Sequence, residues 1–258
     1  MLISPDFMRR IAGVAAREAL PRFRLPGLVS NKLVSGFDPV TEADRETEKA
    51  IRALIRAEFP EHGILGEEFG AEGADARHIW VVDPIDGTRS FISGIPLWGT
   101  LVGLTRDGDA VAGMMAQPFI GELFYATGEG THYEGPHGKA RLSTRATTDL
   151  SEATLCTTTP SIFEPERRAA FDRLERQVRL SRYGADCYAY CMLAAGQIDL
   201  VVEAGLQPYD IVALIPIIER AGGMVTDWDG GPAEGGGGII AAANSTLHAR
   251  ALAILHGR

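Results

Sequence analysis

The stretch WVVDPIDGTRSF, residues 80–91, places two aspartates directly after an apolar run. Such a run is typical of a buried strand, and Pro84 biases Asp83 toward an extended conformation at the end of that strand. Residues 86–88 can begin a short helix, whose first N–H groups have no partner within the helix and can bind an anion. Gly87 has no Cβ, so the main chain there can approach a ligand closely.

Carboxylates beside anion-binding amides are explained if cations lie between them. Mg²⁺ fits, because it prefers an octahedron of hard oxygen ligands, usually one or two carboxylates, water and substrate phosphate. Asp83 can bridge two such ions. The simpler alternative is that Asp86 is only the N-cap of the short helix.

Three other acids stand out: Asp44 in PVTEAD, and Glu67 in GILGEEFG and Asp210 in LQPYDIVAL, of which the last two lie at the edges of apolar elements. A bare charge is costly at the edge of an apolar element. Taken singly, Glu67 can be a solvated loop residue, and Asp210 can be a charge that favours a helix N-terminus. One metal site explains all of these acids more simply than separate accidents do.

Asp44 also fits a purely structural role. Thr41-Glu42-Ala43-Asp44 has the form of a capping box, with Thr41 as the N-cap and Asp44 at the third helical position. That role can coexist with a catalytic one if the Asp44 carboxylate also accepts a hydrogen bond from Thr88.

The chain as a whole limits the class of protein. Its 258 residues are enough for one large domain or two closely packed lobes, and its net charge of −9 argues against nucleic acid as the main partner. No apolar stretch reaches the roughly 18 residues that span a bilayer, so no membrane partner is expected. The 3 cysteines form no C-x-x-C motif, which indicates core thiols in a reducing, cytoplasmic setting.

Hydrophobic periodicity predicts helices and strands in alternation, organised as one compact unit with an α+β lobe at 1–144 and an α/β lobe at 145–258. The predicted helices are 5–20, 41–59, 164–177, 186–195 and an apolar helix from Pro208 to about 221. The predicted strands are 62–65, 78–82, 99–105, 110–116, 122–127, 131–133, 153–157, 178–182 and 199–203. Segments 27–39 and 230–238 are predicted loops, and Asp107-Gly108 is a hairpin signal.

Three motifs, in order along the chain, resemble those of the inositol monophosphatase superfamily. They are G-E-E at 66–68, D-P-I-D-G-T at 83–88, and Y-D-I at 209–211 followed by A-G-G at 221–223. The second matches the family's D-P-[ILV]-D-G-T signature without a gap, whereas the third has Tyr209 where the family has tryptophan. The likeness covers nearly the whole chain and implies a layered α-β-α-β-α sandwich of two sheets. Members of this family are Mg²⁺-dependent phosphatases, often homodimers and often inhibited by lithium.

Carried over by position, the resemblance implies a set of metal ligands. Glu67, Asp83 and the carbonyl of Ile85 would hold a first ion, and Asp83, Asp86 and Asp210 would hold a second. Glu67 would also serve a third, looser site.

The resemblance also implies the reaction. The substrate phosphate would lie on the main-chain N–H groups of Gly87 and Thr88. Thr88, hydrogen-bonded to Asp44, and Glu67 would help to activate a metal-bound water, which attacks phosphorus in line.

Two further acids bear on the substrate. Glu203 lies where inositol phosphatases hold an inositol hydroxyl, and Asp186 begins a predicted helix, where it can also be a simple N-cap. Stretches 88–104 and 181–223 resemble the histidinol-phosphate phosphatase branch more than the inositol branch. Histidinol phosphate carries an amine and an imidazole, and a pocket with two acids suits a cationic ligand.

The expected activity is therefore histidinol-phosphate phosphatase. The alternatives are inositol-1-phosphate phosphatase and 3′(2′),5′-bisphosphate nucleotidase. A non-enzymatic metal-binding protein is a rival of another class, which a missing metal ligand or a replaced Thr88 would favour. The loop with Lys32 and Asp38, near which relatives place a lysine by the third metal, does not align clearly.

Overall fold

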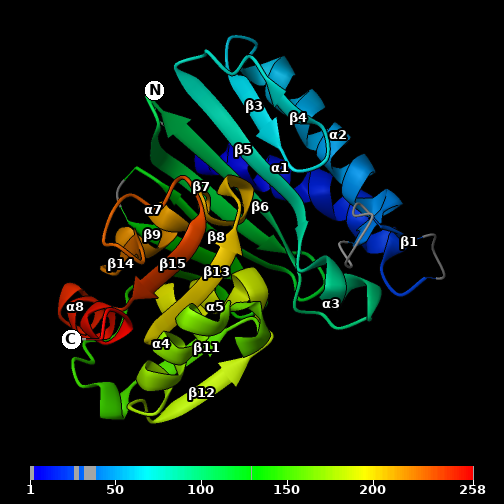
Figure 1. Cartoon of the computed structure of the whole chain (residues 1–258). Coiled ribbons are helices and arrows are strands. Elements are labelled where there is room, and N and C mark those ends of the chain that lie inside the picture. Colours follow the sequence, from blue (N-terminus) through cyan, green and yellow to red (C-terminus); the bar gives the residue numbers. More distant parts are fainter. Residues whose placement is uncertain (1–2, 26–28, 32–38, 129, 258) are drawn as a thin grey trace.

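The structure of the chain is a computed structural model that describes residues 3–25, 29–31, 39–128 and 130–257. Two β-sheets and their helices stack in five layers, in the order helices, sheet, helices, sheet, helices (Figure 1). Large apolar cores fill the spaces between these layers. The predicted layered α/β sandwich is therefore confirmed.

The first sheet has the strand order β10-β9-β8-β7-β6-β5-β3-β4. Its strands are β3 Gly63–Gly66, β4 Gly70–Glu72, β5 His78–Asp86, β6 Gly99–Arg106, β7 Asp109–Gln117, β8 Glu122–Thr127, β9 Thr131–Gly135 and β10 Gly138–Leu142. Neighbouring strands are antiparallel except β3 and β5, which run parallel. The Asp107-Gly108 turn joins β6 to β7, as its hairpin signal predicted.

Helices α1 Pro5–Ala19 and α2 Glu42–Glu58 cover one face of the first sheet (Figure 1). Trp80 and Val82 of β5 pack in the core beneath these helices. Since side chains alternate along a strand, Asp83 turns to the opposite face, which meets the middle layer of helices.

The second sheet has the strand order β12-β11-β13-β15-β14, in which β12, β11 and β13 are parallel and β15 is antiparallel to both of its neighbours. Its strands are β11 Thr154–Thr157, β12 Leu180–Tyr183, β13 Leu200–Leu206, β14 Met224–Asp227 and β15 Gly237–Ala242. The outer helices are α4 Pro165–Glu175 and α8 Ser245–Leu255, and the helices between the sheets are α5 Asp186–Ala194, α6 Pro208–Ile211 and α7 Leu214–Glu219.

The middle layer meets the first sheet at a pair of glycines. Gly103 of β6 lies opposite Gly113 of β7. A Cβ on Gly113 would lie 1.9 Å from the carbonyl oxygen of Ala213, and one on Gly103 would lie 2.8 Å from the nitrogen of Ala213. Only glycine permits this approach. The pair thus seats the segment between α6 and α7 against the sheet, directly after the residues that carry Asp210.

Several predicted boundaries are wrong. The predicted loop 27–39 contains β1 Val29–Asn31 and the first residue of β2 Pro39–Thr41, and these two strands pair with each other. The rest of the predicted loop lies outside the described residues. The last two residues of the predicted loop 230–238 begin β15. The single helix predicted from Pro208 is divided into α6 and α7 at 212–213, where the chain rests on the glycine pair.

The other predicted elements are present, with ends shifted by a few residues. The first sheet is built from residues 63–142 and the second from residues 154–242. The division of the chain into lobes at residue 144 stays a prediction. Within the described part of the chain, every helix is too short or too polar to cross a bilayer.

Candidate metal centre

Strand β5 carries two of the predicted acids across an irregularity in its pairing. The register between β5 and β6 shifts between Asp83 and Asp86. Two residues three apart would face opposite sides of a regular strand, and a bulge can re-aim a side chain. Asp83 is 2% exposed, and its Oδ1 accepts the main-chain N–H of Ile85 at 3.0 Å. The strand continues to Asp86, beyond the end that the sequence had predicted at Val82.

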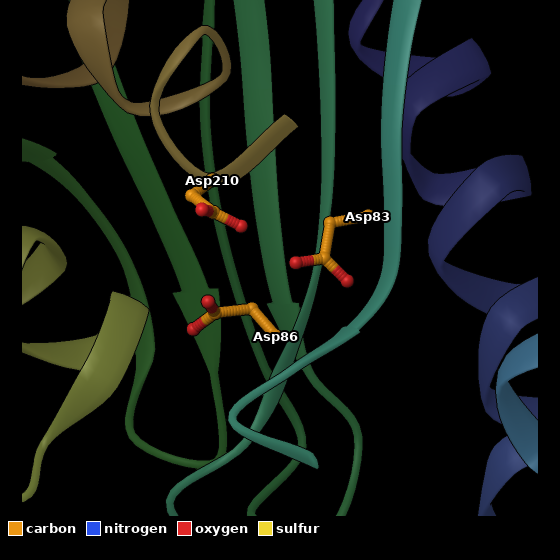
Figure 2. Close-up of side chains that lie close together, drawn as sticks. All are labelled: Asp83, Asp86 and Asp210. Atoms are coloured by element: carbon orange, nitrogen blue, oxygen red, sulfur yellow. The ribbon is translucent and has the colours of Figure 1, made fainter. Parts of the chain in front are cut away.

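A third acid comes from the middle layer. Asp210 lies in α6, and its carboxylate accepts the main-chain N–H of Gln207 at 2.7 Å. Figure 2 shows the carboxylates of Asp83, Asp86 and Asp210 pointing toward one another. One oxygen atom from each lies within 4.8 Å of the other two. Oxygen atoms at this spacing can share one small divalent cation.

Burial and mutual repulsion both disfavour the charged forms of these acids. Burial raises the pKa of Asp83 well above its usual value, and the charges of Glu67, Asp86 and Asp210 raise it further. Burial also raises the pKa of Asp86, as do the charges of Asp186 and Asp210. A bound cation would offset the repulsion. A cluster of hard carboxylate oxygens fits Mg²⁺ better than softer metals.

Glu67 and Asp44 extend the acidic cluster toward α2. Glu67 follows β3 and shares a hydrogen bond with Asp83. Asp44 completes the predicted capping box, because its Oδ2 accepts the main-chain N–H and the hydroxyl of Thr41 at 2.7 and 2.5 Å. Burial raises the pKa of Asp44, and the charge of Glu67 adds to this rise. The structural role of Asp44 is thus present, and its Oδ1 lies 3.4 Å from the hydroxyl of Thr88.

Helix α3, Thr88–Ile92, begins directly after the second aspartate of β5. Its N-cap is Gly87, in the left-handed conformation with φ 79°. The alternative that Asp86 is the N-cap of this helix is therefore wrong. The Thr88 hydroxyl lies 3.0 Å from the carbonyl oxygen of Ile85 and farther from Asp44. A hydroxyl has one proton to donate, so the shorter bond dominates in this arrangement.

The two acids predicted to bind substrate are joined by a threonine. Glu203 accepts the main-chain N–H of Thr158 at 2.6 Å and its hydroxyl at 3.1 Å, and the same hydroxyl lies 3.4 Å from Asp186. Asp186 also accepts the hydroxyl of Ser90 at 3.0 Å. Burial raises the pKa of Glu203 to about 8, although the hydrogen bonds from Thr158 act in the opposite direction. Burial likewise raises the pKa of Asp186.

The alternative that Asp186 is only an N-cap is also wrong. Ala185 is the N-cap of α5, and Asp186 is the first helical residue, with an unusual positive φ of 45°. Helix α5 also contacts the acidic cluster directly, because the main-chain N–H of Cys187 donates to Asp86 at 2.7 Å.

A cavity of about 30 Å³ joins the two groups of acids. Its lining includes Asp86 and Asp210, the substrate-binding candidates Asp186 and Glu203, and Tyr190. The Tyr190 hydroxyl is buried and has no hydrogen-bond partner within the described chain. Buried polar groups normally have a partner, so this hydroxyl points to a group that fills the cavity.

Three residues at the site were not predicted from the sequence: Tyr190, Thr158 and Ser90. Tyr190 lies within an apolar helix and resembles an ordinary core position. Thr158 could have been found, since it directly follows β11 and is the middle of the three threonines at 157–159. The loop at 32–38 lies outside the described residues, and the roles of all predicted site residues stay predictions.

Comparison with known proteins gives a match that spans nearly the whole chain. The sequence model of the inositol monophosphatase family matches residues 8–258. The chain is 41% identical over 228 residues to "Bifunctional phosphatase IMPL2, chloroplastic" of Arabidopsis thaliana, a match that covers 84% of the chain and 65% of that protein. The chain thus spans just under two thirds of the length of this plant relative.

One bacterial relative matches over nearly its full length. The chain is 35% identical over 260 residues to a histidinol-phosphatase of Mycobacterium tuberculosis, which covers 97% of the chain and 98% of that protein. A solved structure of an inositol monophosphatase from Zymomonas mobilis superposes with a TM-score of 0.86 at 40% identity, covering 97% of this chain and 96% of that one.

Proposed function

The chain belongs to the inositol monophosphatase family, and we propose that it is a magnesium-dependent phosphomonoesterase whose substrate is L-histidinol phosphate. The observation that carries this proposal is the convergence of Asp83, Asp86 and Asp210 within 4.8 Å of one another. These three carboxylates lie beside a cavity that two further acids line.

The acids divide into two proposed ligand sets that share Asp83. Glu67, Asp83 and the carbonyl of Ile85 would hold one ion, and Asp83, Asp86 and Asp210 would hold another. Mg²⁺ bound there supplies a Lewis acid, which lowers the pKa of water and neutralises charge on the transferring phosphoryl group.

The residues beside the ligands bind the phosphate and accept a proton. Gly87 and Thr88 donate main-chain N–H groups to the phosphate oxygens. The Thr88 hydroxyl, which donates mainly to the Ile85 carbonyl oxygen, would have to turn toward Asp44, 3.4 Å away, to pass on a proton from the attacking water. Burial raises the pKa of Asp44, and a carboxylate whose pKa lies closer to neutrality is a better general base.

Histidinol phosphate is favoured by Asp186 and Glu203, which also line the cavity. Glu203 keeps its proton at neutral pH while the cavity is empty of cations, because its pKa is about 8. An ammonium or imidazolium group would lower that pKa and form a charge-assisted hydrogen bond. The histidinol-phosphatase of Mycobacterium tuberculosis is a relative whose name supports this choice.

Inositol-1-phosphate is the second candidate. Glu203, Asp186 and Thr158 can also bind the hydroxyls of a neutral polyol, and the Zymomonas mobilis structure is described as an inositol monophosphatase. The bisphosphate nucleotides form a third class that the same metal centre could hydrolyse.

A phosphate-release assay with Mg²⁺ tests the proposal. The substrates are L-histidinol phosphate, inositol-1-phosphate and 3′-phosphoadenosine 5′-phosphate, compared by kcat/KM. We expect histidinol phosphate to be preferred, and Glu203→Gln to lower its kcat/KM by about 10- to 100-fold, because truncating one partner of a buried charge pair costs on the order of 2 kcal/mol or more.

Glu166→Gln is the matched control, because Glu166 is exposed on α4. It should leave kcat/KM unchanged. A preference for inositol-1-phosphate would overturn the substrate assignment and keep the phosphatase. No release from any of the three esters would overturn the proposed phosphatase activity itself.

The family resemblance also predicts a homodimer that lithium inhibits. Sedimentation equilibrium and activity measured against LiCl concentration test these two points. A monomer at micromolar concentration would contradict the first, and full activity in LiCl would contradict the second.

A further inference from the structure

Glu48 is a buried acid that lies outside the predicted metal site. It is 0% exposed on α2, one helical turn before Arg52, which is 4% exposed. The Arg52 Nε donates to Glu48 Oε1 at 2.7 Å. Buried ion pairs contribute little to stability on average, because desolvation offsets the attraction. The other contacts of this pair indicate a second role.

The Glu48 carboxylate binds the turn that follows β3. Its Oε2 accepts the main-chain N–H of Glu68 at 2.7 Å, and its Oε1 lies 3.4 Å from the main-chain nitrogen of Phe69. Gly66 makes room for it, since a Cβ there would lie 1.8 Å from Glu48 Oε1. The glycine before the Glu-Glu pair is thus required by a carboxylate from another element.

Arg52 holds the other end of the same hairpin. It donates to the carbonyl oxygen of Gly70 and, at 3.3 Å, to Glu72. These contacts clamp β3, its turn and β4 onto α2.

Glu67 is consequently held on both sides. Its own main-chain N–H donates to the carbonyl oxygen of Val82 at 3.1 Å, directly before Asp83. The next N–H along the chain, that of Glu68, is the one that Glu48 accepts. The side chain of Glu67 is therefore directed at Asp83 by a main chain fixed at two successive positions.

We propose that Glu48, held by Arg52, is a positioning residue for the metal ligand Glu67, an inference that rests on the proposed metal site. The pair keeps the turn in the conformation that places Glu67 beside Asp83 before any ion binds. A group that orients a ligand in this way commonly changes metal affinity 10- to 100-fold when it is altered.

Calorimetric titration of the metal-free protein with Mn²⁺ and Mg²⁺, without substrate, tests the role of Glu48. Glu48→Gln should weaken one metal equivalent about 10-fold and leave the other unchanged, because the amide accepts a weaker hydrogen bond and no longer pairs with Arg52. Glu67→Gln should weaken the same equivalent. The Mg²⁺ concentration for half-maximal activity should rise in parallel, with the KM for substrate unchanged.

Ile55→Val is the matched control, since Ile55 is a buried residue of the same helix and this change costs about 1 kcal/mol of stability. It should lower the Tm without moving the metal isotherm. If Glu48→Gln does not fold, Glu48→Asp serves instead, because it keeps the charge beside Arg52 and withdraws it from the Glu68 N–H.

The outcomes separate this inference from the proposed function. A lower Tm with wild-type metal affinity would show that the pair only stabilises the hairpin, and would overturn the inference alone. A wild-type protein that binds neither ion would overturn the metal site, and the inference with it.

Discussion

Asp83 is almost fully buried among other acids, and its ionised form is opposed by burial and by three neighbouring carboxylates. Such a residue lowers the stability of the metal-free protein, and only a bound cation offsets this cost. A substitution that keeps the shape of the Asp83 side chain and removes its charge should therefore abolish function without lowering the stability of the fold.

Asp83→Asn should abolish metal binding by the cluster and lower turnover by at least about 100-fold, while the metal-free protein stays folded and is no less stable than the wild type. The physical reason is that the amide removes the repulsion together with the ligand oxygen charge. Phosphate release at saturating Mg²⁺ and urea denaturation in EDTA measure the two effects. Asp75→Asn, at an exposed position, should change neither. Near-normal turnover of Asp83→Asn would contradict the metal assignment.

Glu203 makes stability depend on pH. Its pKa is about 8 in the folded chain against a usual value of 4.5, so the folded state binds more protons than the unfolded state between these values. The contribution of Glu203 to the free energy of unfolding should then be largest below pH 4.5. It should be lost as the pH rises from 4.5 through 8. The loss is at most about 5 kcal/mol, from 1.36 kcal/mol for each pKa unit.

Urea denaturation of the metal-free protein at pH 6 and pH 8.5 measures this effect. Glu203→Gln cannot ionise, so its free energy of unfolding should fall less over the same interval. Parallel pH profiles for the two proteins would show that Glu203 has a nearly normal pKa in the folded state.

The acids of the site could be predicted from the sequence, because an ionised side chain at the end of an apolar segment is rare without a partner. Asp83, Asp86 and Asp210 were identified in this way, and they do converge. Tyr190 and Glu48 could not be identified, since both lie in helices where nothing in the spacing distinguishes a core residue from one beside the site.

At the scale of elements, the seat formed by Gly103 and Gly113 decides where α6 lies. The two residues are neighbours across β6 and β7, and the main chain at Ala213 approaches both of them. Any side chain here would push α6 away from the sheet, and Asp210 with it.

Gly113→Ala should therefore cost about 1–3 kcal/mol of stability through overpacking and raise the Mg²⁺ concentration needed for half-maximal activity. The added Cβ would lie 1.9 Å from the Ala213 carbonyl oxygen. Gly13→Ala makes the same chemical change in α1, where the nearest atom is 3.8 Å away, and should be neutral or stabilising. Thermal denaturation and Mg²⁺ titration of both variants measure the difference, and equal behaviour would exclude the seat as a determinant of the site.

The elements that the sequence analysis missed have weak or ambiguous patterns. The strand β10, GKARL, is mostly exposed and lacks an apolar alternation, whereas β15 has a continuous apolar run because both of its faces are buried. Strands β4 and β14 are only three or four residues long. Helix α8 could have been predicted, since Asn244 is its N-cap and accepts the main-chain N–H of Leu247.

For the whole molecule, the metal cluster is a point where the first sheet and the middle layer are joined. Two of its carboxylates come from β5 and one from α6, while α5 reaches the cluster through the N–H of Cys187. An ion at this point would bind the assembled layers and not the unfolded chain.

Mg²⁺ should accordingly raise the Tm. At 100 times the dissociation constant, binding adds about 2.7 kcal/mol, which corresponds to a shift of roughly 5–10 °C for a chain of this size. Differential scanning calorimetry in Mg²⁺ and in EDTA measures the shift. Asp83→Asn should show none, and an equal Tm of the wild type in both solutions would contradict binding at the cluster.

The distance along the chain between the acids of the cluster affects when the cluster forms during folding. Asp86 and Asp210 are more than a hundred residues apart, and Asp210 reaches the cluster only after α6 has docked on its glycine seat. Contacts between such distant residues are expected late in folding, after the main barrier has been crossed. Mg²⁺ would then leave the folding rate almost unchanged and slow unfolding, so that the lifetime of the native chain follows the supply of the ion.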